Sequence, residues 1–127
     1  MERAVKLNDG RQIPVIGLGL FRSEGENEAE NAIRYAYEAG YRLFDTASYY
    51  HNEEAVGRGL QMLHVPREEL FVTTKIWTDE QKSGDVEGAL DRSLKKLQLD
   101  YVDMYMIHWP VRECFDRVWE EMARLKE

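Results

Sequence analysis

The sequence predicts an α/β fold of about four βα units in succession, preceded by a small hairpin. Short apolar runs alternate with stretches in which apolar residues recur at helical spacing. Each unit is about thirty residues long, the length of one βα step in a (β/α)8 barrel. Such a barrel typically needs about 250 residues, whereas the chain has 127. We therefore expect residues 1–127 to form one domain, the N-terminal half of a (β/α)8 TIM barrel, and we expect this chain to be truncated, cleaved or engineered.

The composition is typical of a globular protein and argues against several kinds of partner. Apolar residues make up 43% of the chain, charged residues 32%, and the formal net charge is −7. An acidic chain is poorly suited to nucleic acid or to an anionic membrane, so we expect neither as a partner. The sequence has no apolar run of the ~20 residues that span a bilayer, and its N-terminus does not resemble a signal peptide. Because Cys114 is the single cysteine, no internal disulfide can form, and we expect a cytoplasmic protein.

The first half of the chain carries clear turn and cap signals. Asp9-Gly10 suits a tight hairpin turn, Gly40 suits a helix stop, and Asn52 is expected to cap a helix by accepting hydrogen bonds from its free amides. Gly17-Leu18-Gly19 does not begin a dinucleotide fingerprint, because Arg22 occupies the place of the third glycine. The expected elements are a hairpin over 5–14, a buried strand over 15–19, a helix over 28–39, a strand over 41–45 and a helix from 53.

The second half repeats the same alternation. Apolar residues recur at helical spacing over 86–97 and again over 115–125. We expect Trp119, which lies on the apolar stripe of the last helix, to belong to the core. The expected elements are a strand over 70–75, a polar loop, a helix over 86–97, a strand over 102–107 and a helix over 115–125.

Three of the predicted strands stop on a polar residue: Asp45, Lys75 and His108. The carboxyl ends of parallel strands share one rim of the sheet, so these side chains should converge. Tyr50 follows Asp45 in the next loop and should join them. Taken singly, each has an ordinary structural explanation, such as an ion pair for Asp45 and Lys75 or a half-buried ring for Tyr50. Their convergence favours a functional site.

Four segments together resemble the N-terminal half of an aldo-keto reductase, and they span nearly the whole chain. The branch that contains diketogluconate reductases and prostaglandin F synthases is the most similar. The segments are LNDGRQIPVIGLG, GYRLFDTASYYHNEEAVGRGL, REELFVTTKIW and SLKKLQLDYVDMYMIHWP.

The resemblance implies an NADPH-dependent reductase of aldehydes or ketones and assigns roles to individual residues. It implies a catalytic tetrad of Asp45, Tyr50, Lys75 and His108. It implies cofactor contacts from Gly19, Leu20 and Asp45. It also implies a substrate pocket lined by Phe21, Trp77, His108 and Trp109, with Phe21 in place of the commoner tryptophan.

The chemistry of these residue types agrees with that assignment. Reduction of a carbonyl group needs a hydride on carbon and a proton on oxygen, and a nicotinamide must supply the hydride. A phenol with an unperturbed pKa near 10 transfers a proton poorly at neutral pH unless a cation stabilises its anion. Lys75 would be that cation, Asp45 would hold it charged, and His108 could donate a hydrogen bond to the substrate oxygen.

Several alternatives remain open from the sequence. In the family, most of the NADPH site lies in the C-terminal half, and an open sheet has two unpaired edges. The chain could therefore be inactive alone, pairing with a second copy or with a C-terminal half, or could be a non-catalytic assembly module. A lysine-dependent aldolase using Lys75 is a less favoured class. A metal site from Asp45, His51 and His108 lacks the usual ligand spacing, so we expect no metal. The substrate and the choice between NADPH and NADH are not determined.

Overall fold

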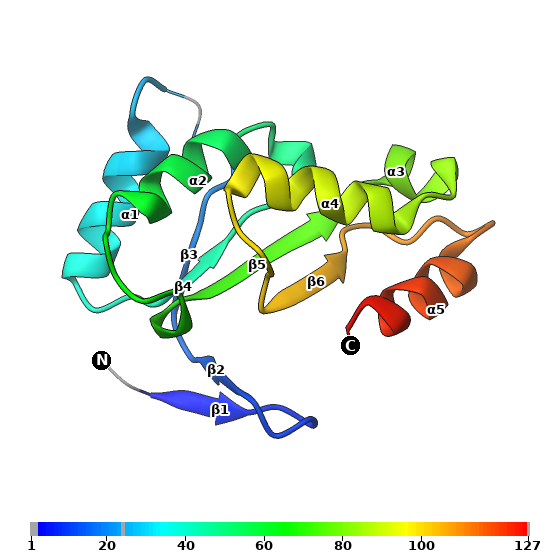
Figure 1. The fold of residues 1–127 in the computed structure, drawn as a ribbon, viewed down its shortest axis with the longest axis horizontal. Helices are drawn as coiled ribbons and strands as arrows, with labels where there is room; N and C mark the ends of the chain where they lie inside the picture. Colours follow the sequence, from blue (N-terminus) through cyan, green and yellow to red (C-terminus); the bar gives the residue numbers. More distant parts are fainter. Residues whose placement is uncertain (1–2, 24, 127) are drawn as a thin grey trace.

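The computed structural model describes residues 3–23 and 25–126, which form a hairpin, a parallel sheet and helices packed against it (Figure 1). The strands are β1 (Ala4–Lys6), β2 (Gln12–Pro14), β3 (Gly17–Gly19), β4 (Leu43–Asp45), β5 (Phe71–Ile76) and β6 (Met104–Ile107). The helices are α1 (Glu28–Glu38), α2 (Glu53–Gln61), α3 (Thr78–Ser83), α4 (Val86–Leu97) and α5 (Phe115–Leu125), with 3₁₀ turns η1 (Ser48–Tyr50) and η2 (Arg67–Glu69). The predicted α/β fold is confirmed.

The parallel sheet has the order β3-β4-β5-β6, so each strand pairs with its neighbours in the chain. Its register places Gly19 beside Asp45 and Asp45 beside Thr73. Lys75 lies two residues beyond Thr73 on β5. Since side chains two residues apart point to the same face of a sheet, Asp45 and Lys75 share the face opposite the helices.

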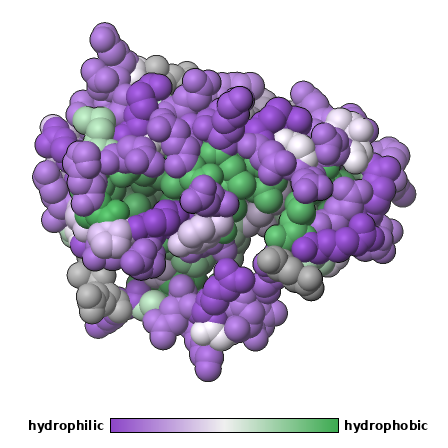
Figure 2. Space-filling view, in the orientation of Figure 1, coloured by the Kyte–Doolittle hydropathy of each residue, from purple (hydrophilic) through white to green (hydrophobic). Residues whose placement is uncertain are grey.

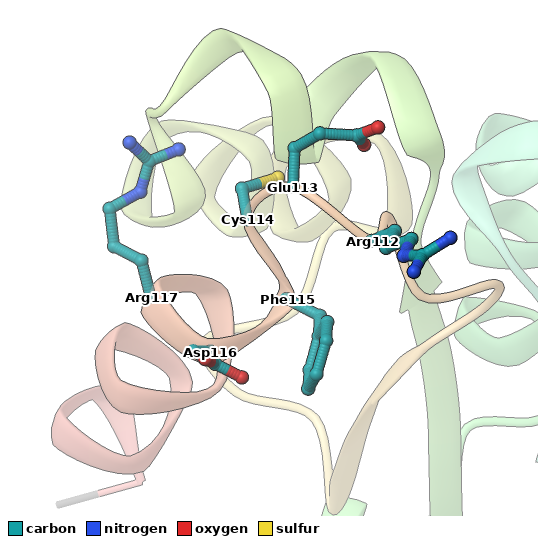
Figure 3. A pocket seen from close by; sticks show the side chains of 6 residues that line it. All are labelled: Arg112, Glu113, Cys114, Phe115, Asp116 and Arg117. Carbon is teal, nitrogen blue, oxygen red and sulfur yellow. The ribbon is translucent and has the colours of Figure 1, made fainter.

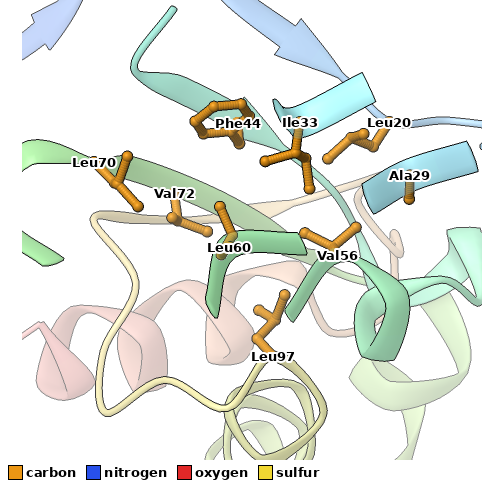
Figure 4. Close-up of a cluster of buried hydrophobic side chains, with 9 residues drawn as sticks. All are labelled: Leu20, Ala29, Ile33, Phe44, Val56, Leu60, Leu70, Val72 and Leu97. Carbon is orange, nitrogen blue, oxygen red and sulfur yellow. The ribbon is translucent and has the colours of Figure 1, made fainter. Parts of the chain in front are cut away.

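The main core lies between the other face of the sheet and helices α1, α2 and α4. Phe44 and Val72 contribute from adjacent strands, and both are fully buried; burial of each such side chain stabilises the fold by about 1.5–3 kcal/mol. Gly57 of α2 lies against α4, where a Cβ would come 2.6 Å from the carbonyl oxygen of Leu97. The cluster shown in Figure 4 comprises Leu20, Ala29, Ile33, Phe44, Val56, Leu60, Leu70, Val72 and Leu97.

A second, smaller core joins α4 and α5 to the end of β5. Val118 and Met122 of α5 are buried there, together with Ile76. Trp119, predicted to be core, is instead 64% exposed, because α5 packs on one side only and the flank of its apolar stripe remains uncovered. Hydrophobic residues form a band across the middle of the face seen in Figure 2. Within the described ranges, no helix combines the length and apolar character of a membrane span.

Three local predictions are corrected by the structure. The expected polar loop contains the short helix α3, whose first turn is acidic and which stops at Gly84 with φ 80°. The expected strand over 15–19 is shorter, and Val15 is 54% exposed. Asn52 occupies the N-cap position of α2 as predicted, but its side chain makes no capping hydrogen bond with the helix amides. Its side chain accepts a hydrogen bond from Thr46 Oγ1 at 3.1 Å and donates one to the carbonyl oxygen of Leu20 at 2.7 Å, because it is buried where these loop groups need partners.

Candidate active site

An ion pair between Lys75 and Asp45 lies at the centre of the rim. Lys75 Nζ is 2.8 Å from each carboxylate oxygen of Asp45 and 3.0 Å from the carbonyl oxygen of Thr46. The lysine side chain is 12% exposed and that of the aspartate 31%. Strand register brings the two side chains to one face, and the two contacts with the carboxylate fix the position of the Lys75 ammonium group.

Tyr50 is brought to the same place by turn η1. Lys75 Nζ lies 3.3 Å from Tyr50 Oη and 5.0 Å from the centre of its ring. The turn ends at His51, whose φ of 57° reverses the chain before α2 begins. A cation at this distance can stabilise negative charge that develops on the phenol oxygen during a reaction, so Lys75 is placed to assist proton transfer at Tyr50 Oη.

His108 follows β6 and completes the group predicted from the sequence. Its backbone N–H donates to the carbonyl oxygen of Ile76 at 3.2 Å, and its ring meets the Tyr50 ring edge-on at 5.5 Å. Burial lowers the pKa of His108 below its usual value, and the charge of Lys75 lowers it further, while Asp45 acts in the opposite direction. The imidazole is therefore neutral at pH 7, with one N–H to donate.

Aromatic rings surround this polar group. The rings of Trp77 and Trp109 have centroids 5.0 Å apart, and Phe21 lies 5.0 Å from Tyr50. Tyr49, which sequence reasoning missed, stacks on Trp77 at 3.9 Å; its place beside Tyr50 in the same loop was the available signal. Trp109 is 62% exposed and Phe21 54%, so the rings form a wall that is open to solvent.

The residues predicted to contact a cofactor differ in their surroundings. Gly19 lies beside Asp45, and a Cβ there would meet no atom within 4 Å, so the backbone leaves room for a flat group. The Leu20 side chain is fully buried in the main core. Its backbone N–H donates to the carbonyl oxygen of Asp45 at 3.0 Å. The Leu20 side chain is therefore enclosed by the core and not available to a ligand.

Two other hollows lie near the rim without containing the group around Lys75. One, of about 270 Å³, is at the start of α5 and is lined by residues 112–117 (Figure 3). Cys114 lies there as the residue before α5, with its Sγ 3.7 Å from the carbonyl oxygen of Gln81. The other includes His51 and Asn52. Among the described residues, no three His, Cys, Asp or Glu side chains are grouped as metal ligands.

Fold and site together define a class: half of a parallel α/β barrel with a lysine, a carboxylate, a tyrosine and a histidine at its rim. The Aldo/keto reductase family model matches residues 15–127. The chain belongs to the aldo/keto reductase family, which confirms the resemblance read from the sequence.

Individual relatives show how much of a family member the chain represents. It is 42% identical over 125 residues to a glyoxal reductase of Bacillus subtilis, covering 98% of this chain and 45% of that protein. An aldo/keto reductase from Brucella melitensis superposes with a TM-score of 0.89 at 43% identity, over 98% of this chain and 49% of the other. A Bombyx mori aldo-keto reductase in complex with NADP gives 0.88 at 40% identity, over 96% and 46%. The chain spans about half the length of the relatives it matches and forms half of a barrel.

Proposed function

We propose that the chain carries the catalytic residues of an NADPH-dependent reductase of small aldehydes or ketones. One observation carries the proposal: Asp45 holds Lys75 Nζ within 3.3 Å of Tyr50 Oη. General acid catalysis needs a proton donor beside the carbonyl oxygen. In this arrangement, the phenol gives its proton to that oxygen while the ammonium group stabilises the phenolate that remains.

His108 and the aromatic wall orient the substrate. The neutral imidazole donates a hydrogen bond to the carbonyl oxygen, which places that oxygen near Tyr50 Oη. Trp77 and Trp109, with ring centroids 5.0 Å apart, exclude water from the apolar part of the substrate. Such placement within hydrogen-bond reach is what converts a weak acid into an effective catalyst.

The described residues fit one end of the cofactor. The open space over Gly19, beside Asp45, accommodates a flat ring, and NADPH when bound supplies the hydride. The Bombyx mori relative is in complex with NADP. We expect the remaining contacts with NADPH to come from the C-terminal half of a barrel, in cis or in trans.

That half is also the partner that the sheet favours. Within the described residues, β3 and β6 each pair on one side only, and unpaired strand edges recruit further strands. A C-terminal half would pair with both edges, and a second copy of the chain is the alternative. We expect the assembled protein to act in the cytoplasm, where Cys114 stays a free thiol.

The test is co-expression of the chain with the C-terminal half of the Bacillus subtilis glyoxal reductase, followed by purification of the complex. We expect this complemented protein to oxidise NADPH in the presence of glyoxal, and the chain alone to show little or no turnover. Tyr50→Phe should abolish the turnover of the complemented protein. A purified complex that binds NADPH but reduces no aldehyde or ketone would overturn the proposed activity. Failure of the two halves to associate would overturn the proposed partner.

A non-catalytic assembly module is the second candidate, and the exposed apolar residues favour it. Met106 on edge strand β6 is 40% exposed, and Trp119 is 64% exposed. Sedimentation of the complemented protein with and without NADPH separates the two candidates: a discrete assembly without bound cofactor supports the module, and co-migration of NADPH supports the reductase. A Schiff-base role for Lys75 is disfavoured, because both carboxylate oxygens of Asp45 and the carbonyl oxygen of Thr46 already engage its Nζ, which leaves it poorly placed to attack a carbonyl group.

A further inference from the structure

Glu80, in the first turn of α3, joins that helix to the turn that carries Tyr50. Its Oε1 accepts a hydrogen bond from the backbone N–H of Trp77 at 2.9 Å and another from Ser48 Oγ. Ser48 Oγ also lies 3.2 Å from the carbonyl oxygen of Lys75. A hydroxyl has one proton, and a charged acceptor forms the stronger bond. The carboxylate of Glu80 is therefore the main anchor of η1.

Gln81, the next residue, joins α3 to the loop that follows β6. Its side chain is fully buried. Its Nε2 donates to the carbonyl oxygen of Trp109 at 2.9 Å, and its Oε1 accepts from the backbone N–H of Val111 at 3.4 Å. An unpaired amide in the interior is unfavourable, so Gln81 holds this loop at a fixed distance from α3.

These anchors matter because the residues of the site are not all held by the sheet. Asp45 and Lys75 lie in the strand ladder, whereas Tyr50 and Trp109 lie in connections outside it. Adjacent residues of a helix project about 100° apart. Glu80 and Gln81 can therefore reach two different connections from one turn of α3.

We propose that Glu80 and Gln81 are positioning residues: Glu80 holds Tyr50 against Lys75, and Gln81 holds Trp109 at the opening. The effect on turnover rests on the proposed function, because proton transfer requires Tyr50 Oη within hydrogen-bond reach of the substrate. The placement of Trp109 can be measured in the chain itself, without turnover.

The first experiment uses circular dichroism of the 127-residue chain carrying Trp119→Phe, which leaves Trp77 and Trp109 as the two tryptophans. Two indole rings 5.0 Å apart couple electronically and give a paired band in the circular dichroism spectrum. Trp109→Phe removes one of the two rings, so the band that disappears in this variant is the one from the pair. We expect Gln81→Leu, which removes the hydrogen bonds of the Gln81 side chain at similar volume, to lose most of this band. Gln61→Leu, on the exposed surface of α2, is the matched control and should retain it.

The second experiment measures turnover by the complemented protein. We expect Glu80→Ala to lower kcat at least about tenfold with little change in KM, because a small misplacement of the acid slows the chemical step. Glu80→Gln keeps the acceptor oxygen and should restore most of kcat. Glu87→Ala, exposed on α4, should behave like the unmodified protein. Gln81→Leu should mainly raise KM, since Trp109 lines the opening.

The roles proposed for Gln81 and Glu80 can be disproved separately. If Gln81→Leu folds and keeps the paired tryptophan band, the proposed role of Gln81 is wrong. If Gln81→Leu does not fold, Gln81→Met, whose side chain is unbranched and of similar length, is used for the same measurement. Unchanged kcat in Glu80→Ala overturns the role of Glu80, and so does full activity of Ser48→Ala, which removes only the hydroxyl. If the complemented protein has no activity, the proposed function fails, while loss of the band in Gln81→Leu still supports the placement of Trp109.

Discussion

Two ion pairs lie at opposite ends of the central strand β5, and they differ in what surrounds them. At its amino end, Arg67 Nη2 lies 2.7 Å from Asp103 Oδ2. At its carboxyl end, Lys75 Nζ lies 2.8 Å from Asp45 Oδ2. Both pairs are partly buried, so exposure alone does not tell which one is structural and which one has chemistry to perform.

The difference lies in where each network of hydrogen bonds ends. Arg67 also donates to the carbonyl oxygens of Leu70 and Tyr101, and Asp103 also accepts from the backbone N–H of Val72. Every one of these partners is a fixed group at the start of a strand, which suits the planar, multiply donating guanidinium group. The network of Lys75 ends at the Tyr50 hydroxyl, beside open aromatic rings. The pair at the amino end closes on the backbone, whereas the pair at the carboxyl end reaches a hydroxyl group, as the proposed proton transfer requires.

The largest expected effect comes from removing the cation at the carboxyl end. In the complemented protein, Lys75→Met should lower kcat by at least about 100-fold, because the phenolate of Tyr50 loses its stabilising charge. NADPH oxidation followed by absorbance is the measurement, and the exposed Lys82→Met of α3 is the control. Turnover within tenfold of the unmodified protein would show that Tyr50 does not depend on this lysine.

Removing the cation at the amino end should affect stability instead. Arg67→Met removes the side-chain donor to two backbone carbonyls and one of the two donors to Asp103, and we expect it to lower the free energy of unfolding by about 2 kcal/mol. Urea unfolding of the 127-residue chain measures this loss, with exposed Arg124→Met as the control. Equal losses in the two variants would mean that the buried pair contributes nothing specific.

A third carboxylate has hydroxyl partners instead of a cation. Glu53 is 2% exposed, and it accepts hydrogen bonds from Thr74 Oγ1 at 2.7 Å and Ser93 Oγ at 2.9 Å. Burial raises its pKa above the usual 4.5, and the two hydroxyls oppose that shift. The folded protein therefore binds this proton more tightly than the unfolded chain, and the resulting stability is lost as the pH rises through the folded pKa.

Glu53→Gln should consequently stabilise the protein at neutral and alkaline pH, because the amide carries no charge that burial would destabilise. The gain should disappear below about pH 4.5, where the carboxyl group is protonated in both states. Thermal melts across this pH range measure the effect, and exposed Glu54→Gln should show no such pH dependence. If Glu53→Gln stabilised the protein equally at every pH, the buried charge of Glu53 would not be the cause of the effect.

The smallest effect is expected for an exposed pair. Arg34 and Glu38 lie 3.7 Å apart on α1, with side chains that are 48% and 62% exposed. Glu38→Gln should change the free energy of unfolding by less than about 0.5 kcal/mol, because water and salt screen such charges. A change as large as that for Arg67→Met in the same urea titration would remove the distinction between buried and exposed pairs.

The sequence predicted what periodicity and strand ends encode. The apolar runs at β4, β5 and β6 each deliver a polar residue to the rim, and the structure places Asp45, Lys75, Tyr50 and His108 together. Their catalytic role stays a prediction. Helix spacing also placed the buried stripes of α2 and α4, with Val56 and Val86 fully buried.

What the sequence did not predict depends on tertiary partners. Helix α3 is six residues long and has no apolar stripe, so periodicity could not detect it; the acidic pair Asp79-Glu80 and the stop at Gly84 were the available signals. Asn52 has the residue type of a cap, but its buried position gives it Thr46 and Leu20 as partners. The exposure of Trp119 depends on which side of α5 is covered, and a single helix pattern does not encode this.

The strand order of the sheet has a consequence for how the protein folds. Because β3, β4, β5 and β6 are adjacent in space in the same order as in the chain, each new pairing closes a loop of only one βα unit. Loop closure of this length has a limited entropic cost, because that cost grows only slowly with the number of residues in the loop. Folding intermediates made of two adjacent units would therefore already contain native register.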